Sequence, residues 1–293
     1  MKPFEYKRPS SLEEACTMLA AQDGRVKALA GGTDLLVQMK QGGLELDALV
    51  SLRDVPGLDA LHLEEDGSLI MGSATPLGAI ENSPDVRRAF PGIAEAASFV
   101  GSMQVRSRAT VGGNLCNAAP SADTAPILIA CGSTAVITDG QADRTVLLED
   151  FFSGPGQTVL GPGELLRAIV VPPVPETGFA KYCKSFRSAM DCCTVGVAVY
   201  SDFVPGSAVV RDLRLALGAV APTPIRARAA EAMLVGQELD EALTDRASLE
   251  AVADALPISD LRASAAYRKV LVEVLSRRAL TAARAWAERG AVA

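Results

Sequence analysis

Two short segments with adjacent glycines constrain the fold of this chain more than any other feature. The first covers residues 29–36 and has the sequence LAGGTDLL, and the second covers residues 110–123 and has the sequence TVGGNLCNAAPSAD. Glycine permits positive φ and lets the backbone approach another group closely. A predicted strand over residues 25–30 runs into the first glycine pair, and a predicted helix over residues 35–40 begins just after it. The first pair is therefore expected to form a strand-to-helix turn.

The chemistry of such a turn suits phosphate groups. The first turn of a helix has unpaired amide N–H groups at the positive end of the helix dipole, and glycines let an anion come close to them. Thr33 adds a hydroxyl to the first segment, while Thr110 and Asn114 offer side-chain partners in the second. Ser121 and Asp123 supply polar groups for a part such as a ribose. We therefore expect the backbone amides of both glycine pairs to converge on the diphosphate of one dinucleotide.

A simpler interpretation of the same residues is also open. A Gly-Gly pair between a strand and a helix is often only a turn, and neither segment has the G-x-G-x-x-G spacing of the Rossmann dinucleotide-binding folds. Each segment alone is a weak signal. The presence of two in one chain is what favours a dinucleotide held from two sides.

The order of predicted strands and helices divides the chain into three parts. Residues 1–55 alternate as β-α-β-α-β, which is typical of a small α/β unit. Residues 56–175 are predicted as a second α/β unit, which ends with a strand over residues 165–171. The sequence VPPVP at residues 171–175 then forms a linker, because proline fixes φ and removes a hydrogen-bond donor.

Residues 176–293 are predicted as a third unit, a three-stranded antiparallel sheet with a layer of helices. The strand candidates are residues 179–185, 193–202 and 209–219, and the helix candidates are residues 225–235, 246–255 and 260–288. The last helix carries an apolar face that suits packing on the sheet, made of Leu261, Val270, Leu271, Val274 and Leu275. The predicted fold class of the whole chain is α+β.

Charge and hydropathy exclude several classes of function. The net charge is -7, and no block is rich in lysine and arginine, so the chain is not expected to bind nucleic acid. The most apolar run, residues 125–136, is broken by Pro126 and Gly132 and is too short to cross a bilayer. Residues 1–5 lack the apolar core of a signal peptide, so a cytoplasmic location is expected.

The chain is also poor in side chains that could carry out catalysis by themselves. Its six cysteines are scattered without C-x-x-C spacing, which argues against an iron–sulfur cluster or a structural zinc ion in this polypeptide. His62 is the only histidine and lies in a predicted strand. Because histidine is the most frequent acid–base residue and the usual base for a nucleophilic serine or cysteine, no catalytic residue and no metal ligand is predicted.

Both glycine segments resemble the FAD-binding segments of the medium subunits of molybdenum hydroxylases, a family that includes bacterial xanthine dehydrogenase and carbon monoxide dehydrogenase. The resemblance extends over nearly the whole chain, from FEY at residues 4–6 to RASAAYR at residues 262–268. It implies two α/β subdomains with a fold similar to that of vanillyl-alcohol oxidase. FAD would lie between them, and the C-terminal domain would help to cover it.

The resemblance also implies which residues contact FAD. Residues 29–36 and 110–114 would contact the diphosphate and the ribose, with Asp123 nearby. Leu166 would pack near the flavin, and a lysine on the strand after the linker would approach the flavin ring. The predicted cofactor-binding residues are Leu29, Ala30, Gly31, Gly32, Thr33, Asp34, Leu35, Leu36, Thr110, Val111, Gly112, Gly113, Asn114, Ala119, Ser121, Asp123, Leu166 and Lys184.

Two lysines compete for the place beside the flavin, Lys184 and Lys181, and Cys183 lies between them. A cation there would stabilise negative charge on the reduced ring. The FAD is expected to be non-covalent, since His62 is the only histidine available for attachment.

The function implied is that of an oxidoreductase subunit that relays electrons from iron–sulfur clusters through FAD to NAD⁺ or another acceptor. Molybdopterin and [2Fe-2S] clusters would lie on a large and a small partner subunit, in a heterotrimer or its dimer. Two alternatives remain at this point. One is a self-sufficient flavin-dependent oxidase or reductase of the same broad fold, and the other is a scaffold whose glycine segments are only turns.

Overall fold

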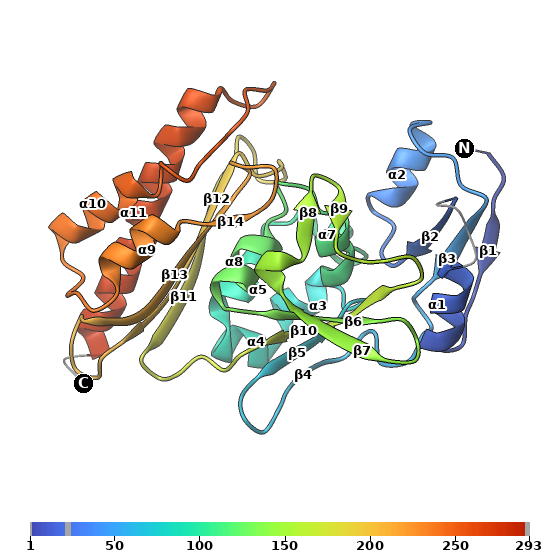
Figure 1. Ribbon diagram of the computed structural model, residues 1–293, viewed down its shortest axis with the longest axis horizontal. Helices are drawn as coiled ribbons and strands as arrows, with labels where there is room; N and C mark the ends of the chain where they lie inside the picture. The colour runs from blue at the N-terminus through green and yellow to red at the C-terminus, as the bar shows by residue number, and fades with distance from the viewer. Residues whose placement is uncertain (1, 21–24, 291–293) are drawn as a thin grey trace.

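The computed structural model describes residues 2–20 and 25–290, in which three larger sheets follow one another along the chain (Figure 1). The first sheet has the order β1-β3-β2, and all of its strands are parallel. Parallel neighbours need crossover connections, which the helices supply. The elements are β1 Glu5–Lys7, α1 Leu12–Ala20, β2 Val26–Leu29, α2 Leu35–Lys40 and β3 Ala48–Ser51. Their order is the β-α-β-α-β alternation that the sequence predicted.

The second sheet is antiparallel and has the order β4-β5-β10-β6-β7. Its strands are β4 Leu61–Leu63, β5 Leu69–Gly72, β6 Thr134–Thr138, β7 Asp143–Leu147 and β10 Leu165–Val171. Short helices are inserted as one block between β5 and β6, namely α3 Leu77–Asn82, α4 Pro84–Ala89, α5 Pro91–Ser98, α6 Met103–Arg106, α7 Val111–Cys116 and α8 Thr124–Ala130. Helices grouped in one block, rather than alternating with strands, give an antiparallel sheet instead of the βαβ alternation of the first unit. After β7 the chain adds η1 Leu148–Asp150 and a small hairpin of β8 Phe152–Gly154 and β9 Gln157–Thr158.

The third sheet has the order β11-β12-β13-β14 and is antiparallel. Its strands are β11 Gly178–Ser185, β12 Val195–Phe203, β13 Val210–Gly218 and β14 Ile225–Arg226. The prediction of three strands was wrong by one, because residues 225 and 226 pair with β13 before the next helix begins. The helices that follow are α9 Arg228–Leu234, α10 Glu241–Glu250 and α11 Ala265–Gly290.

Helical layers cover both faces of the third sheet (Figure 1). Helices α9 and α11 pack on one face, while α5 and α8 of the second unit pack on the other. As a result, all nine residues of β12 are buried. A strand that is covered on both faces has no polar side, which explains the apolar run VGVAVY at the start of β12.

The C-terminal helix begins later than the sequence suggested. The prediction placed it over residues 260–288 with Leu261 and Val270 on the packed face, but Leu261 is 101% exposed and Val270 is 54% exposed. The Asp260 carboxylate accepts hydrogen bonds from the amides two and three residues later, which makes a turn, and the helix starts only at Ala265. The buried face is made of Val272, Leu275, Ala279, Leu280, Ala283 and Ala287. Neither this helix nor another in the described ranges has the length and apolar character needed to cross a bilayer.

Asp260 also ties the start of α11 to the sheet. Both of its carboxylate oxygens accept from Arg268 Nη2 at 2.9 Å, and Arg268 Nη1 donates to the carbonyls of Thr194 and Ala219. Arg268 is 3% exposed, and these bonds give partners to both terminal nitrogens of its buried guanidinium. The two amide donors and then Arg268 lower the pKa of Asp260 to about 2.

Asp260→Asn is expected to lower the free energy of unfolding at pH 7. Because the folded-state pKa lies below the ordinary value, the stabilisation is complete above about pH 4 and is lost as the pH falls through 2. Urea unfolding of the wild type and the variant at pH 7, 5 and 3 measures this difference. The control is Asp59→Asn, at an exposed position. A difference between wild type and Asp260→Asn that grew toward pH 3 would contradict the assignment.

Candidate cofactor site

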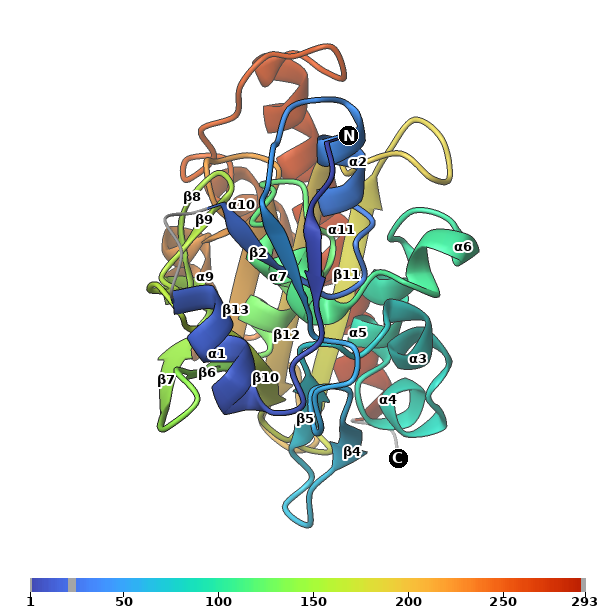
Figure 2. The same ribbon diagram turned by 90° about the vertical axis from the view of Figure 1, so that its right-hand side faces the viewer.

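The first glycine pair lies at the contact between the first and second units. A Cβ atom on Gly31 would lie 2.1 Å from the carbonyl oxygen of Arg108 and 2.8 Å from the Cα of Ala109, directly before the second glycine segment. Gly32 has φ of +75°, a left-handed conformation that glycine adopts without strain. Figures 1 and 2 show the N-terminal sheet next to the side of the second unit that carries α7. The two segments that the sequence singled out therefore meet in space.

The turn around Gly32 leaves backbone donors unused. Within the described part of the chain, the amides of Gly31, Gly32, Thr33 and Asp34 donate no hydrogen bond, and Asp34 makes no side-chain cap bond to α2. The Leu36 amide is the next donor along this turn, bonded to the Gly32 carbonyl at 3.1 Å. Residues 31–33 are half-buried and Asp34 is exposed, and amides that lose water without gaining a partner are unfavourable. A run of them at the start of a helix suits an anionic oxygen, such as that of a phosphate.

The second glycine pair forms part of a helix instead of a loop. Gly112 and Gly113 lie in α7, where the Gly112 amide donates to the Ser73 carbonyl at 2.9 Å and the Gly113 amide donates to Thr110 Oγ1 at 3.0 Å. A Cβ on Gly112 would lie 2.5 Å from the Ser73 oxygen. The expectation that amides of both pairs converge on one diphosphate is therefore wrong for the second pair. Its small residues let α7 pack closely on the chain after β5.

The second segment carries polar side chains that are buried at Thr110 and half-buried at Asn114 and Ser121. Thr110 caps α7 through its hydroxyl oxygen, and the hydroxyl hydrogen can still donate. Asn114 Oδ1 accepts from the Thr124 hydroxyl at 2.6 Å, which leaves the Asn114 amide group as a donor. Ala119 and Ser121 are half-buried in the turn between α7 and α8. Hydroxyl and amide donors therefore remain available beside the first segment.

Asp123 and Lys184 form a buried ion pair between the second and third units. Asp123 is at the N-cap position of α8 but makes no cap bond. Its Oδ2 accepts from Lys184 Nζ at 2.9 Å, and its Oδ1 accepts from the Tyr182 hydroxyl at 2.8 Å. Lys184 Nζ also donates to the Phe99 carbonyl at 3.0 Å. The side chains of Lys184 and Asp123 are 1% and 7% exposed, so the carboxylate predicted as a cofactor contact is committed to β11.

The environment of this ion pair is largely aromatic. Lys184 Nζ lies 5.9 Å from the centre of the Phe99 ring and 5.5 Å from that of Phe186. Burial raises the pKa of Asp123, and the charge and hydrogen bond of Lys184 followed by the Tyr182 hydroxyl oppose this rise. Burial also raises the pKa of Tyr182 well above its usual value, so its hydroxyl remains a donor.

Two other predicted positions lie apart from the ion pair. Lys181 faces Glu95 at 3.5 Å and is 35% exposed, so Lys184 is the one of the two lysines that is bonded to the second segment. Leu166 is 2% exposed on β10, in the hydrophobic core that also contains Val111 and Leu115 of α7. Its contact with a flavin remains a prediction.

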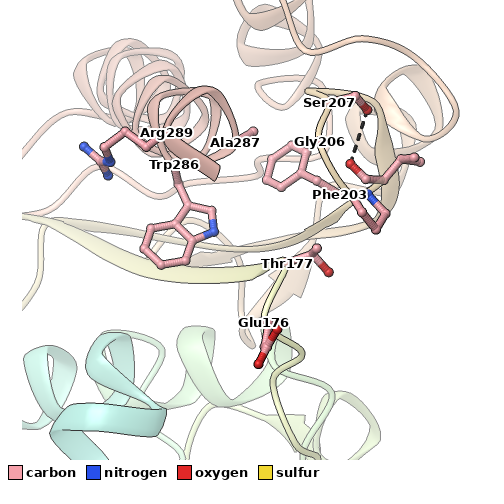
Figure 3. Close-up of a pocket in the computed structure, with 10 residues that line it drawn as sticks. Glu176, Thr177, Phe203, Gly206, Ser207, Trp286, Ala287 and Arg289 are labelled. Carbon is pink, nitrogen blue, oxygen red and sulfur yellow. Dashed lines mark hydrogen bonds between the residues drawn. The ribbon is translucent and has the colours of Figure 1, made fainter. Parts of the chain in front are cut away.

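A separate pocket of about 420 Å³ lies in the third unit (Figure 3). Trp286 and Ala287 of α11 line it together with Phe203 and the turn at residues 204–207. It includes no residue of either glycine segment and lacks Lys184. This pocket therefore contains none of the residues that the sequence predicted to bind the cofactor.

Two family descriptions match the chain. "FAD binding domain in molybdopterin dehydrogenase" matches residues 2–174, and "CO dehydrogenase flavoprotein C-terminal domain" matches residues 180–283. The chain belongs to the FAD-binding medium subunits of the molybdenum hydroxylase family. The boundary between the two matches falls beside the proline-rich linker.

Known relatives resemble this medium subunit over almost all of its length. It is 34% identical to the xanthine dehydrogenase FAD-binding subunit of Escherichia coli O157:H7 over 95% of each chain. It is also 34% identical to the carbon monoxide dehydrogenase medium chain of Afipia carboxidovorans over 97% of this chain and 98% of the relative. These relatives are flavoprotein subunits of oxidoreductases.

Solved structures share the mixed α and β fold of this medium subunit. A carbon monoxide dehydrogenase from Hydrogenophaga pseudoflava matches with a TM-score of 0.93 and 34% identity, over 98% of this chain and 99% of that one. Quinoline 2-oxidoreductase from Pseudomonas putida 86 matches with a TM-score of 0.90 and 28% identity, over 98% and 100%.

The sequence did not indicate several parts of this medium subunit's site. The contact of Gly31 with Arg108 joins residues that are far apart in the sequence, so no local sequence pattern predicts it. Tyr182 had a usable signal, because it lies two residues before Lys184 in a strand and so points to the same side of the sheet. No sequence signal pointed to the Phe99 carbonyl as a partner of Lys184.

Gly31→Ala is expected to destabilise the medium subunit by about 1–3 kcal/mol, the usual cost of forcing a methyl group into a packed site. The added Cβ would collide with the Arg108 carbonyl, which is backbone and cannot rotate away. Urea unfolding measures the effect. The matched control is Gly43→Ala, whose Cβ would meet only the Gln38 oxygen at 3.7 Å. Equal unfolding midpoints for the two variants would count against the contact.

Lys184→Met is expected to cost about 3–5 kcal/mol, because it leaves the Asp123 carboxylate buried without its cation. Adding Asp123→Asn should recover part of the loss, since no buried charge then remains. A double-mutant cycle by urea unfolding gives the coupling free energy of the pair. Lys181→Met is the control, because Lys181 is partly exposed. If Lys184→Met were no more harmful than Lys181→Met, the ion pair would not hold the units together.

Proposed function

We propose that this medium subunit binds one FAD non-covalently between its first and second units and relays electrons through it. The observation that carries the proposal is the contact of Gly31 with Arg108 and Ala109, which joins the two segments expected to hold the cofactor. When bound, FAD supplies redox chemistry that accepts electrons from clusters and passes them on as a pair. The protein supplies binding, orientation and electrostatic stabilisation.

The first segment is the proposed diphosphate site. Its unused amides at residues 31–34 face no acceptor of their own within the described residues, and the Thr33 hydroxyl adds a donor. Backbone amides at the start of α2 would each donate to a phosphate oxygen. The Asn114 amide and the Ser121 hydroxyl are proposed to make polar contacts from the second segment, where backbone donors are already used.

Lys184 is proposed as the residue nearest to the flavin ring. An ammonium group has three donors, and Asp123 and Phe99 take two of them. The third has no partner among residues 2–20 and 25–290. A lysine held at this place would stabilise negative charge on a reduced ring, in line with the family resemblance.

The partners are proposed from the relatives. The similar proteins are named as a FAD-binding subunit and as medium chains, and one similar structure is described as lacking the Mo-pyranopterin moiety of its cofactor. We infer a large molybdopterin-binding subunit and a small [2Fe-2S] subunit, in a cytoplasmic heterotrimer or its dimer. Electrons would arrive from the clusters and leave to NAD⁺ or another acceptor. Similarity to such subunits over 95% of the chain favours this role over a self-sufficient flavin enzyme.

The cofactor content of the purified protein tests the proposal. Co-expressed with its partner subunits, the chain should carry one FAD that acid precipitation releases into solution. Gly31→Ala should weaken FAD binding about tenfold or more, equivalent to at least about 1.4 kcal/mol, while Gly43→Ala should not. A colourless complex, or flavin that stays attached to the precipitated chain, would refute non-covalent FAD binding.

A further inference from the structure

We propose that Tyr182 and Asp123 are positioning residues that set how much of the positive charge of Lys184 reaches the flavin. The inference rests on the function proposed above, in which Lys184 lies beside the flavin ring. In this arrangement the Asp123 carboxylate opposes the positive charge of Lys184, and the Tyr182 hydroxyl controls how strongly it does so.

The structure holds the tyrosine hydroxyl in place from several sides. Tyr182 and Lys184 lie two residues apart on β11, so both reach Asp123 from the same face of the strand. The Tyr182 ring is 1% exposed and packs edge-on against Phe99, with ring centres 6.1 Å apart. On the neighbouring strand a Cβ at Gly196 would lie 2.5 Å from the Tyr182 hydroxyl oxygen, so only glycine leaves room for that oxygen.

The hydrogen bonds divide the Asp123 carboxylate between two donors. Oδ1 accepts from Tyr182 and Oδ2 accepts from Lys184, at 2.8 and 2.9 Å. The Cys193 sulfur lies 3.6 Å from the tyrosine oxygen, and burial raises the pKa of this thiol to about 12, so it stays neutral. Asp123 and Lys184 are therefore the charges at the centre of this cluster, and they oppose each other.

Such a pair gives the ammonium a reduced effective charge. In surroundings of low dielectric, a carboxylate at this distance cancels much of the field of the cation. A hydroxyl that donates to the carboxylate takes up part of its negative charge, and hydrogen bonds in one network polarise one another. The Tyr182 hydroxyl thus leaves more of the Lys184 charge uncompensated than a carboxylate without that donor would.

Opposite signs are expected for two substitutions. Tyr182→Phe removes the donor, so the carboxylate screens Lys184 more strongly and the flavin midpoint potential should fall. Asp123→Asn removes the counter-charge, so the potential should rise. General loosening of the site gives no reason for two opposite shifts, which separates positioning from a merely structural role.

The midpoint potential of the flavin is measured by spectroelectrochemical titration of the assembled complex, together with its FAD content. Tyr200→Phe is the matched control, because it deletes the same atom from a tyrosine of β12 that is bonded to neither Asp123 nor Lys184. Its potential should equal that of the wild type. If Asp123→Asn does not assemble, Tyr182→Phe and its control decide the question.

An unchanged or higher potential in Tyr182→Phe, with full FAD content, would overturn the inference and leave the proposed function intact. Loss of FAD from Tyr182→Phe would overturn it too, since the hydroxyl would then serve retention of the cofactor. A wild-type complex without FAD would overturn both the inference and the function on which it rests.

Discussion

The geometry of the site depends on a close approach of two backbones, that of Gly31 and that of Arg108 and Ala109. Hydrogen is the only side chain that fits between them. This contact fixes where the first sheet sits on the second unit, and with it the direction in which the amides of residues 31–34 point. The proposed cofactor site thus depends on two units packed together, and no local sequence element could form it alone.

A second contact, of a different kind, joins the second unit to the third. The ion pair of Asp123 and Lys184 is buried, so each charge depends on the other and on the Tyr182 hydroxyl and Phe99 carbonyl around them. Ion pairs of this kind contribute less net stability than specificity, because desolvation offsets much of their attraction. Here the ion pair and the Tyr182 bond align β11 with the start of α8.

Much of the architecture could be predicted from patterns among residues that are close together in the sequence. The alternation over residues 1–55, the proline-rich linker and the apolar run of β12 each reflect a local rule, and the structure follows them. The features that could not be predicted depend on contacts between residues that are far apart in the sequence, or on very short elements. The strand β14 is only two residues long, and the turn made by Asp260 delays the start of the last helix until Ala265.

The candidate site shows the same division. The residues of both segments could be proposed in advance, because glycine pairs and a family motif mark them, but the sequence left the choice between Lys184 and Lys181 open. Their structural roles could not be predicted, because glycine is a poor helix former and yet Gly112 lies in α7, in close contact with Ser73. Asp123 was predicted as a polar contact to the cofactor, and its bonds to Tyr182 and Lys184 on β11 could not be read from the sequence.

The burial of β12 on both faces has a consequence for how the chain assembles. One cover, α8, precedes the strand in the sequence, and the other, α11, follows it. During synthesis the sheet therefore forms against a surface that has already left the ribosome, while its opposite face waits for a helix not yet made. Until α11 has been made, one apolar face of the strand is uncovered, and the time needed to translate residues 204–290 contributes to how long that face is open to chaperones or to aggregation.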